Sequence, residues 1–135
     1  MSKQIIETDK APAAIVSFDS IVPYSQAVAA NGFLYVSGCL GVDSKTGDFV
    51  SDNVVEQCRC ALDNMKAIVE AAGCTMEDVI KCSVFVQDMN DFAQVNTVYA
   101  EYFSERPPAR ECIQAACLPK NAKYEISAIA IHRGE

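Results

Sequence analysis

The segment from Tyr124 to His132, YEISAIAIH, sets the strongest limit on how this chain can fold. Successive side chains of a β-strand point to opposite faces of the sheet. From Glu125 to Ile131 both sets are apolar or small, with the exception of Glu125 itself. A strand that is apolar on both faces needs cover on both. Whatever fold the chain adopts therefore has to bury this strand from two sides.

Two amphipathic helices are predicted, over residues 52–72 and 92–104, because apolar side chains recur there at every third or fourth position. Ser51 or Asp52 is expected to cap the start of the first helix, and Gly73 to close its end. The two helices supply one covering layer.

The remaining regular segments predict strands, in the order β-β-β-α-β-α-β-β. They are residues 4–8, the two arms of a hairpin (26–38) that turns at Asn31-Gly32, residues 80–86, 109–118 and 124–132. This order gives one domain, residues 1–135, of the α+β class, with helices on one face of a sheet. No element remains to cover the other face, so we expect further copies of the chain to do so.

Composition narrows the function classes. The net charge of −7 disfavours nucleic acid and anionic membranes as partners. No apolar run approaches the roughly 20 residues of a membrane-spanning helix, and the start has no secretory signal, so a cytoplasmic protein is expected. Seven cysteines, an odd number without CxxC spacing, disfavour a disulfide framework. His132 is the only histidine, which disfavours a zinc site.

Two charged residues interrupt the apolar strands, Arg110 and Glu125. Each has an ordinary interpretation, as an exposed charge at the end or edge of a strand. However, Pro107 and Pro108 fix the backbone just before Arg110, and a guanidinium can hold a carboxylate through two parallel hydrogen bonds. The pair then predicts a site where Arg110 binds a small acid and Glu125 positions a water molecule.

The spacing of these residues conflicts with a simple hairpin. If residues 109–118 and 124–132 paired around the turn PKNAK, Glu125 would lie about 20 Å from Arg110 along the strand. Either the two strands are not paired in this way, or a neighbouring chain completes the site.

Several motifs resemble the Rid (YjgF-type) family of reactive-intermediate deaminases. They are APAAI, PYSQAV, KTGD, ALDNMKAIVEAAG, DMNDFAQVNTVYAEYF and PPARECIQAACLPKNAKYEISAIA, in order along nearly the whole chain. The resemblance implies a chorismate-mutase-like α+β fold, with a mixed six-stranded sheet, two helices on one face and sites between the subunits of a homotrimer. It also implies hydrolysis of 2-imino acids and their 2-enamino tautomers to 2-keto acids and ammonia, without cofactor or metal.

Seven positions match functional positions of the family. The resemblance assigns Arg110 to the substrate carboxylate, Glu125 to the attacking water and Tyr24 to proton relay. The remaining matches line the cleft: Cys112, through its backbone groups, Ser37, Gly38 and Asn96. A nucleophilic Cys112 thiol is a weaker alternative, because His132 would have to lie beside it as a base.

The chain departs from the family pattern at three places. The segment VSFDSIV, residues 16–22, is longer than the usual connection and is expected to reshape the cleft near Tyr24. Glu111 replaces a small residue and should point away from the cleft. The stretch GCLGV replaces one that typically carries glutamine and proline. A non-catalytic small-carboxylate-binding or regulatory protein is therefore a second hypothesis, and an endoribonuclease or translation inhibitor a third, which the charge disfavours.

Overall fold

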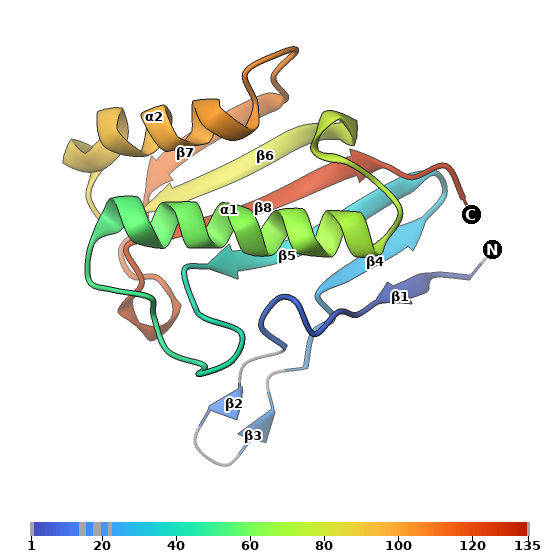
Figure 1. Ribbon diagram of the computed structural model, residues 1–135, viewed down its shortest axis with the longest axis horizontal. Coiled ribbons are helices and arrows are strands. Elements are labelled where there is room, and N and C mark those ends of the chain that lie inside the picture. The colour runs from blue at the N-terminus through green and yellow to red at the C-terminus, as the bar shows by residue number, and fades with distance from the viewer. Residues whose placement is uncertain (1, 14–15, 18–19, 22, 135) are drawn as a thin grey trace.

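Both long helices lie on the same face of a six-stranded sheet (Figure 1). The computed structural model describes residues 2–13, 16–17, 20–21 and 23–134. The helices are α1 (Val54–Ala71) and α2 (Phe92–Tyr102). The sheet has the strand order β1 (Gln4–Ile6), β4 (Ala27–Ala30), β5 (Phe33–Leu40), β8 (Tyr124–Ile131), β6 (Val79–Val86) and β7 (Ala109–Gln114).

The sheet is mixed, because β6 and β7 run parallel while the other neighbouring strands are antiparallel. A parallel pair needs a crossover connection, and α2 provides it between β6 and β7. The predicted α+β class, the two helices and the six strands in their chain order are confirmed.

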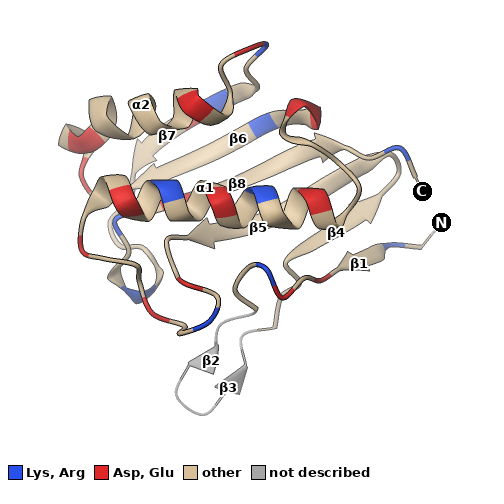
Figure 2. Ribbon diagram, in the orientation of Figure 1, with Lys and Arg blue, Asp and Glu red and all other residues tan. Residues whose placement is uncertain are grey.

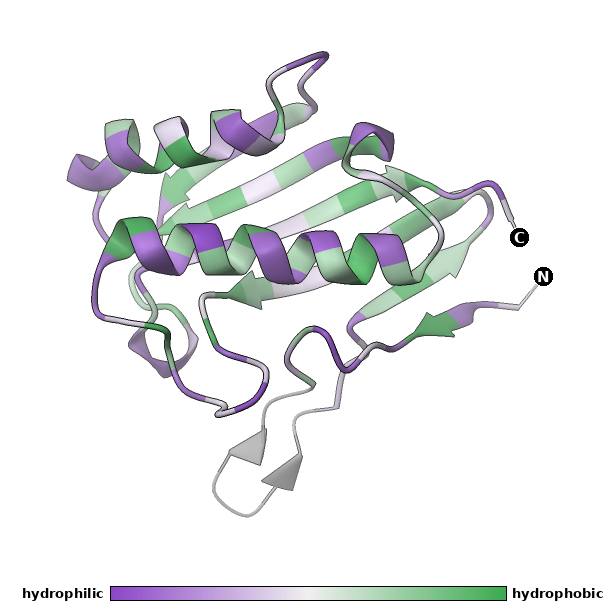
Figure 3. Cartoon of the chain, viewed as in Figure 1, coloured by the Kyte–Doolittle hydropathy of each residue, from purple (hydrophilic) through white to green (hydrophobic). Residues whose placement is uncertain are grey.

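The N-terminal cap of α1 lies one residue after Asp52 and two after Ser51, the predicted caps. The side chain of Asn53, not Ser51 or Asp52, accepts the hydrogen bond from the Glu56 amide at 3.0 Å. Ser51 instead accepts a bond from the Asn53 amide. Gly73 has a φ of 83°, the left-handed conformation that the prediction required just beyond the helix. Figure 3 shows hydrophilic residues along the side of α1 that faces the viewer, away from the sheet.

Local turn chemistry places the strands in register. Asn31 and Gly32 have φ values of 53° and 88°, as the predicted two-residue turn between β4 and β5 requires. In β6 a register shift between Val79 and Lys81 turns Ile80 outward, and its side chain is 39% exposed. Simple alternation over residues 80–86 would put Ile80 on the same face as Cys82, and the bulge is the reason that it does not lie there.

Strand β8 lies in the interior of the sheet, between β5 and β6. Its helix-facing side chains, from Tyr124 to Ala130, are buried against the helices and neighbouring strands. On the other face the described residues provide no α-helix; only the end near Leu40 and Phe85 is covered, by the segment around Leu118 and Ala122. Five large apolar side chains there are each between 38% and 51% exposed: Ile5, Phe33, Tyr35, Ile113 and Ile131. We call this surface the helix-free face.

Residues 16–17 (β2, Val16–Ser17) and 20–21 (β3, Ser20–Ile21), which follow β1 and precede β4 in the sequence, pair as a two-stranded ribbon separate from the sheet (Figure 1). Residues 18, 19 and 22 of the same segment lie outside the described residues, so the predicted effect of VSFDSIV on the cleft is not tested. In the described part of the chain, neither α1 nor any other helix has the length and apolar composition needed to cross a membrane.

Candidate functional site

The strand order separates the two charged residues of the predicted site. Strand β6 lies between β7 and β8, so the simple hairpin is not formed. Arg110 pairs in register with Cys82, whereas Glu125 pairs with Phe85. Three residues along a strand and two strand spacings put the two Cα atoms about 14 Å apart. The seven predicted residues accordingly fall into two groups.

The first group surrounds the Arg110 guanidinium on the helix side of the sheet. Its Nη1 donates to the Asn96 side-chain oxygen at 2.7 Å. The guanidinium carbon lies 4.7 Å from the centre of the Tyr99 ring and 5.6 Å from that of the Phe92 ring. These three partners come from α2, at a spacing of four and three residues, which places them on one side of the helix.

Arg110 has no acidic partner here. Among the described residues, the ion pairs involve Arg59, Lys81 and Arg133, and none involves Arg110. Asn96 is neutral and uses one of the five N–H donors of the guanidinium. The positive charge and most of its donors are therefore available to an anion.

Cys112 lies on the same side of β7 as Arg110 and packs partly against the core. Burial raises the pKa of its thiol, and the nearby Arg110 lowers it by a smaller amount. A thiol that stays protonated at neutral pH is a poor nucleophile. The nucleophile hypothesis needs His132 beside Cys112. His132 lies six residues beyond the β8 residue that is aligned with Cys112 across β6, which is about 20 Å along the strand direction.

The second group contains Glu125, on the helix-free face, and Gly38, which lies against its carboxylate. Glu125 stands between Leu40 of β5 and Phe85 of β6 in the sheet register. A Cβ atom added to Gly38 would come within 1.9 Å of its Oε2 atom, so the carboxylate rests directly on the glycine backbone. Burial among these neighbours raises the pKa of Glu125 above its ordinary value.

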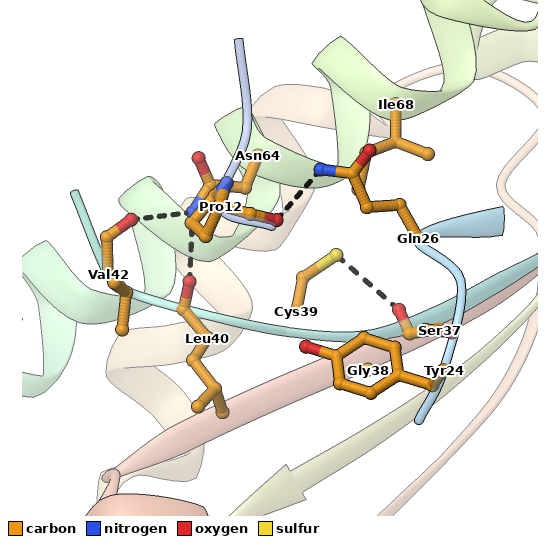
Figure 4. A pocket seen from close by; sticks show the side chains of 10 residues that line it. All are labelled: Pro12, Tyr24, Gln26, Ser37, Gly38, Cys39, Leu40, Val42, Asn64 and Ile68. Carbon is orange, nitrogen blue, oxygen red and sulfur yellow. Dashed lines mark hydrogen bonds between the residues drawn. The ribbon is translucent and has the colours of Figure 1, made fainter. Parts of the chain in front are cut away.

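Tyr24, Ser37 and Gly38 line one cavity of about 40 Å³ that extends to Asn64 of α1 (Figure 4), and of these three residues Gly38 is the one that lies against Glu125. That is room for a water molecule. The Ser37 hydroxyl donates to the Ser25 carbonyl at 2.6 Å, which holds the Tyr24 loop against β5. Cys39 forms part of the wall, where burial and the neighbouring Glu125 raise its thiol pKa to about 12.

Asn64 of α1 fixes the far wall of this cavity. Its amide donates to the Leu40 carbonyl at 3.0 Å and to the Val42 carbonyl at 2.9 Å. The bonds tie the end of β5 to α1, just beyond the register shift between Val36 and Cys39. A bulge at this place turns Gly38 toward Glu125, so the backbone that supports the carboxylate is itself held by a buried side chain.

Glu111 points away from Arg110, as strand alternation predicts. It pairs with Lys81 at 2.9 Å and accepts a hydrogen bond from Ser83, both on the helix-free face. These contacts, first the bond from Ser83 and then the one from Lys81, lower the pKa of Glu111. Among the described residues, no three His, Cys, Asp or Glu side chains gather as a metal site would require.

The opposite pKa shifts of the two glutamates give a pH prediction. The folded-state pKa of Glu125 is raised, so its stabilising effect is present at low pH and is lost as pH rises through that pKa. Glu125→Gln should therefore raise the melting temperature at pH 7, and the gain should vanish toward about pH 4.

Glu111→Gln is the matched control for that prediction. The pKa of Glu111 is lowered, so its contribution is present at neutral pH and disappears as pH falls. This variant should have a lower melting temperature than the parent at pH 7 and the same one at low pH. Thermal unfolding at fixed protein concentration measures both; a pH-independent difference for Glu125→Gln would contradict the assigned shift.

Sequence reasoning missed three residues of these groups. In the sequence, Phe92 and Tyr99 belong to the apolar spacing that predicts the helix over residues 92–104, and Cys39 lies in the stretch GCLGV that departs from the family pattern. The spacing of Phe92, Asn96 and Tyr99 was the available signal, since it places two rings on either side of a polar residue.

Comparisons with known proteins agree with this architecture. A sequence model of the family described as Endoribonuclease L-PSP matches residues 14–132. The 2-iminobutanoate/2-iminopropanoate deaminase of Escherichia coli K12 is 48% identical over 136 residues, which cover 98% of this chain and 100% of that protein. A RutC family protein of Pyrococcus horikoshii, PH0854, is 48% identical over 128 residues, covering 95% and 97%.

Among solved structures, E. coli TdcF with bound serine matches with a TM-score of 0.86 and 44% identity, over 96% of this chain and 98% of that one. These likenesses define the class, a YjgF-type α+β protein with two helices on a six-stranded mixed sheet. The chain belongs to the Rid (YjgF) family, as its motifs predicted.

Proposed function

We propose that this protein hydrolyses 2-imino acids and their 2-enamino tautomers, and releases 2-keto acids and ammonia. Relatives named 2-iminobutanoate/2-iminopropanoate deaminase, at 44–48% identity over nearly the whole chain, support the reaction class. The structural observation that carries the proposal is the Arg110 guanidinium, which is held by a neutral amide and left without an acidic partner among the described residues.

In this proposal Arg110 binds the substrate carboxylate through its remaining N–H donors. Strand β7 is an edge strand, paired only with β6 in the described chain, so part of its backbone can also contact the substrate. Cys112 would contribute through that backbone. Asn96 holds the guanidinium and forms the adjoining wall of the site.

Glu125, with Tyr24, Ser37 and Gly38 around it, would act on the water molecule. Its raised pKa makes this carboxylate a stronger base than an exposed one. Water adds to the imine carbon and gives a tetrahedral aminoalcohol. Transfer of a proton to its nitrogen allows ammonia to leave, and the C=O bond of the 2-keto acid forms. The atoms balance with one water consumed, and Tyr24 is the proposed relay for the proton.

Arg110 and Glu125 point to opposite faces of one sheet, so a single chain cannot bring both to one small substrate. We therefore propose that the site lies between chains of a homotrimer, with Arg110 from one subunit and Glu125 from its neighbour. The five exposed apolar side chains of the helix-free face support an interface there, and association would give β8 its second cover.

The test is the rate of 2-ketobutyrate formation when a threonine dehydratase acts on threonine. The purified protein should raise this rate above that of spontaneous imine hydrolysis, and the gain should grow with its concentration until the dehydratase is limiting. Equal rates with and without the protein would contradict the proposal. Sedimentation of the same sample tests the trimer separately.

RNA cleavage is the second candidate, because the matching family is described as Endoribonuclease L-PSP. The charge distribution opposes it. Figure 2 shows acidic and basic residues interleaved along α1 and not gathered into a basic stripe, and the net charge is −7. Cleavage of RNA by the parent protein that is lost in Arg110→Ala would favour this candidate over imine hydrolysis.

We place the protein in the cytoplasm, a reducing compartment in which its seven free cysteines stay unpaired.

A further inference from the structure

The Arg110 guanidinium is held on more than one side before any ligand is bound. Tyr99 and Phe92 present their rings to it at 4.7 Å and 5.6 Å, and Asn96 accepts a bond from Nη1 at 2.7 Å. A cation within about 6 Å of a ring centre is attracted by the electrons of the ring face. Three successive turns of α2 thus contact one charged group.

The Tyr99 ring is itself fixed in place. It is 8% exposed, and the ring of Phe103 packs against it at 4.7 Å between centres. Its hydroxyl is buried without a hydrogen-bond partner of normal geometry, and the Cys82 thiol is the polar group beside it. The hydroxyl therefore does little to hold the ring, whereas packing holds it firmly.

A rigid guanidinium is valuable to a site that must grip a small acid. An arginine side chain is flexible, and ordering it when a ligand binds reduces affinity. Rings that hold the guanidinium in the free protein remove most of that loss. The rings offer no oxygen or nitrogen acceptor beside the guanidinium, so the N–H donors that Asn96 does not use stay free for hydrogen bonds.

We propose that Tyr99, with Phe92 as the outer wall, is a positioning residue that orients Arg110 for carboxylate binding. Tyr99 acts through the face of its ring and not through its hydroxyl, and it touches no substrate. The inference rests on the proposed function in one respect, the role of Arg110 as the carboxylate anchor.

The test compares Tyr99→Leu, Tyr99→Phe and Phe92→Leu, with Tyr102→Leu as a matched control. Tyr102 is on the same helix, but its hydroxyl donates to Asp63 at 2.6 Å, on the α1 side. Two measurements are made on each protein. Calorimetry gives the affinity for 2-ketobutyrate, and ¹⁵N relaxation gives the order parameter of the Arg110 Nε–H group in the absence of ligand.

Tyr99→Leu should weaken 2-ketobutyrate binding by about tenfold and Phe92→Leu by about threefold. Both should lower the Arg110 order parameter. Tyr99→Phe keeps the ring and should match the parent in both measurements, as should Tyr102→Leu. A parent-like order parameter and affinity in Tyr99→Leu would overturn the proposal. So would a loss in Tyr99→Phe as large as that in Tyr99→Leu.

The design separates failure of this inference from failure of the proposed function. If the parent binds 2-ketobutyrate but does not accelerate imine hydrolysis, the proposed reaction is wrong, and the binding data still decide the role of Tyr99. If the parent binds no 2-keto acid, Arg110 is not the anchor and the positioning role falls with it. If Tyr99→Leu does not fold, Phe92→Leu decides, since Phe92 is only partly buried at the start of α2.

Discussion

Replacing Arg110 with alanine is expected to reduce imine hydrolysis by about a hundredfold or more. Removing one partner of a hydrogen-bonded charge pair typically loses about 2–5 kcal/mol, and each 1.4 kcal/mol is a factor of ten in rate. Arg110→Lys keeps the charge but not the planar fork, so it should recover only part of the activity. The coupled threonine dehydratase assay measures all three proteins.

The fold should tolerate the change to alanine. Arg110 lies on the edge strand β7, and its contacts are to α2 side chains at the margin of the core. Circular dichroism and sedimentation should therefore match the parent. Near-parental activity in a folded Arg110→Ala protein would show that the carboxylate anchor lies elsewhere, and the proposed reaction geometry would have to be abandoned.

Mixed assemblies extend this prediction to the location of the site. Arg110→Ala and Glu125→Ala subunits are each inactive in the proposal, but a trimer that contains both has some interfaces with one intact Arg110 and one intact Glu125. Random mixing in equal amounts should restore about a quarter of the sites. If refolded mixtures stay as inactive as the separate variants, both residues do not come together from neighbouring chains.

Much of the fold was predictable because its determinants are local in the sequence. Apolar spacing located both helices, and Asn31-Gly32 located the hairpin turn. The pairing of β7 was not predictable in the same way. It joins β6 as a parallel neighbour across a helix and leaves β8 in the interior, a choice made by contacts between residues far apart in sequence.

The charged residues of the candidate site were predictable, and its geometry was not. Arg110 and Glu125 stood out because charges rarely interrupt apolar strands. Which face each occupies depends on the register of β7 and β8 against β6, and one residue of slip would reverse it. Tyr99 and Phe92 escaped notice for a related reason, since an aromatic residue on a helix stripe is usually part of the core.

Gly38→Ala is expected to reduce imine hydrolysis by about a hundredfold, in the range typical for loss of acid–base catalysis, with little change in stability. The added methyl group would lie 1.9 Å from Oε2 and 2.9 Å from the carboxyl carbon of Glu125. These atoms are at the free end of a flexible side chain, so the side chain can move away. The fold survives, but the carboxylate no longer occupies its place against residue 38.

Gly41→Ala is the matched control. Gly41 lies on the same segment as Gly38, but a Cβ atom added there would contact backbone atoms and not the end of a side chain. Its Cβ would fall 2.5 Å from both the Cα and the carbonyl oxygen of Gln57, within helix α1. The helix backbone cannot move aside without losing its packing against the sheet. We therefore expect a loss of about 3 kcal/mol in the free energy of unfolding. Urea unfolding should therefore show the larger loss of stability in Gly41→Ala. The larger loss of activity per folded molecule should be found in Gly38→Ala.

A double substitution then decides whether Gly38→Ala acts through Glu125. If the methyl group does no more than displace the carboxylate, Gly38→Ala combined with Glu125→Ala should be no less active than Glu125→Ala alone, because the second change has nothing left to remove. Additive losses would mean that Gly38 contributes separately, through contact of its own backbone with the substrate. In that case the close approach of glycine and carboxylate would be a feature of packing, and the position of Glu125 would not depend on it.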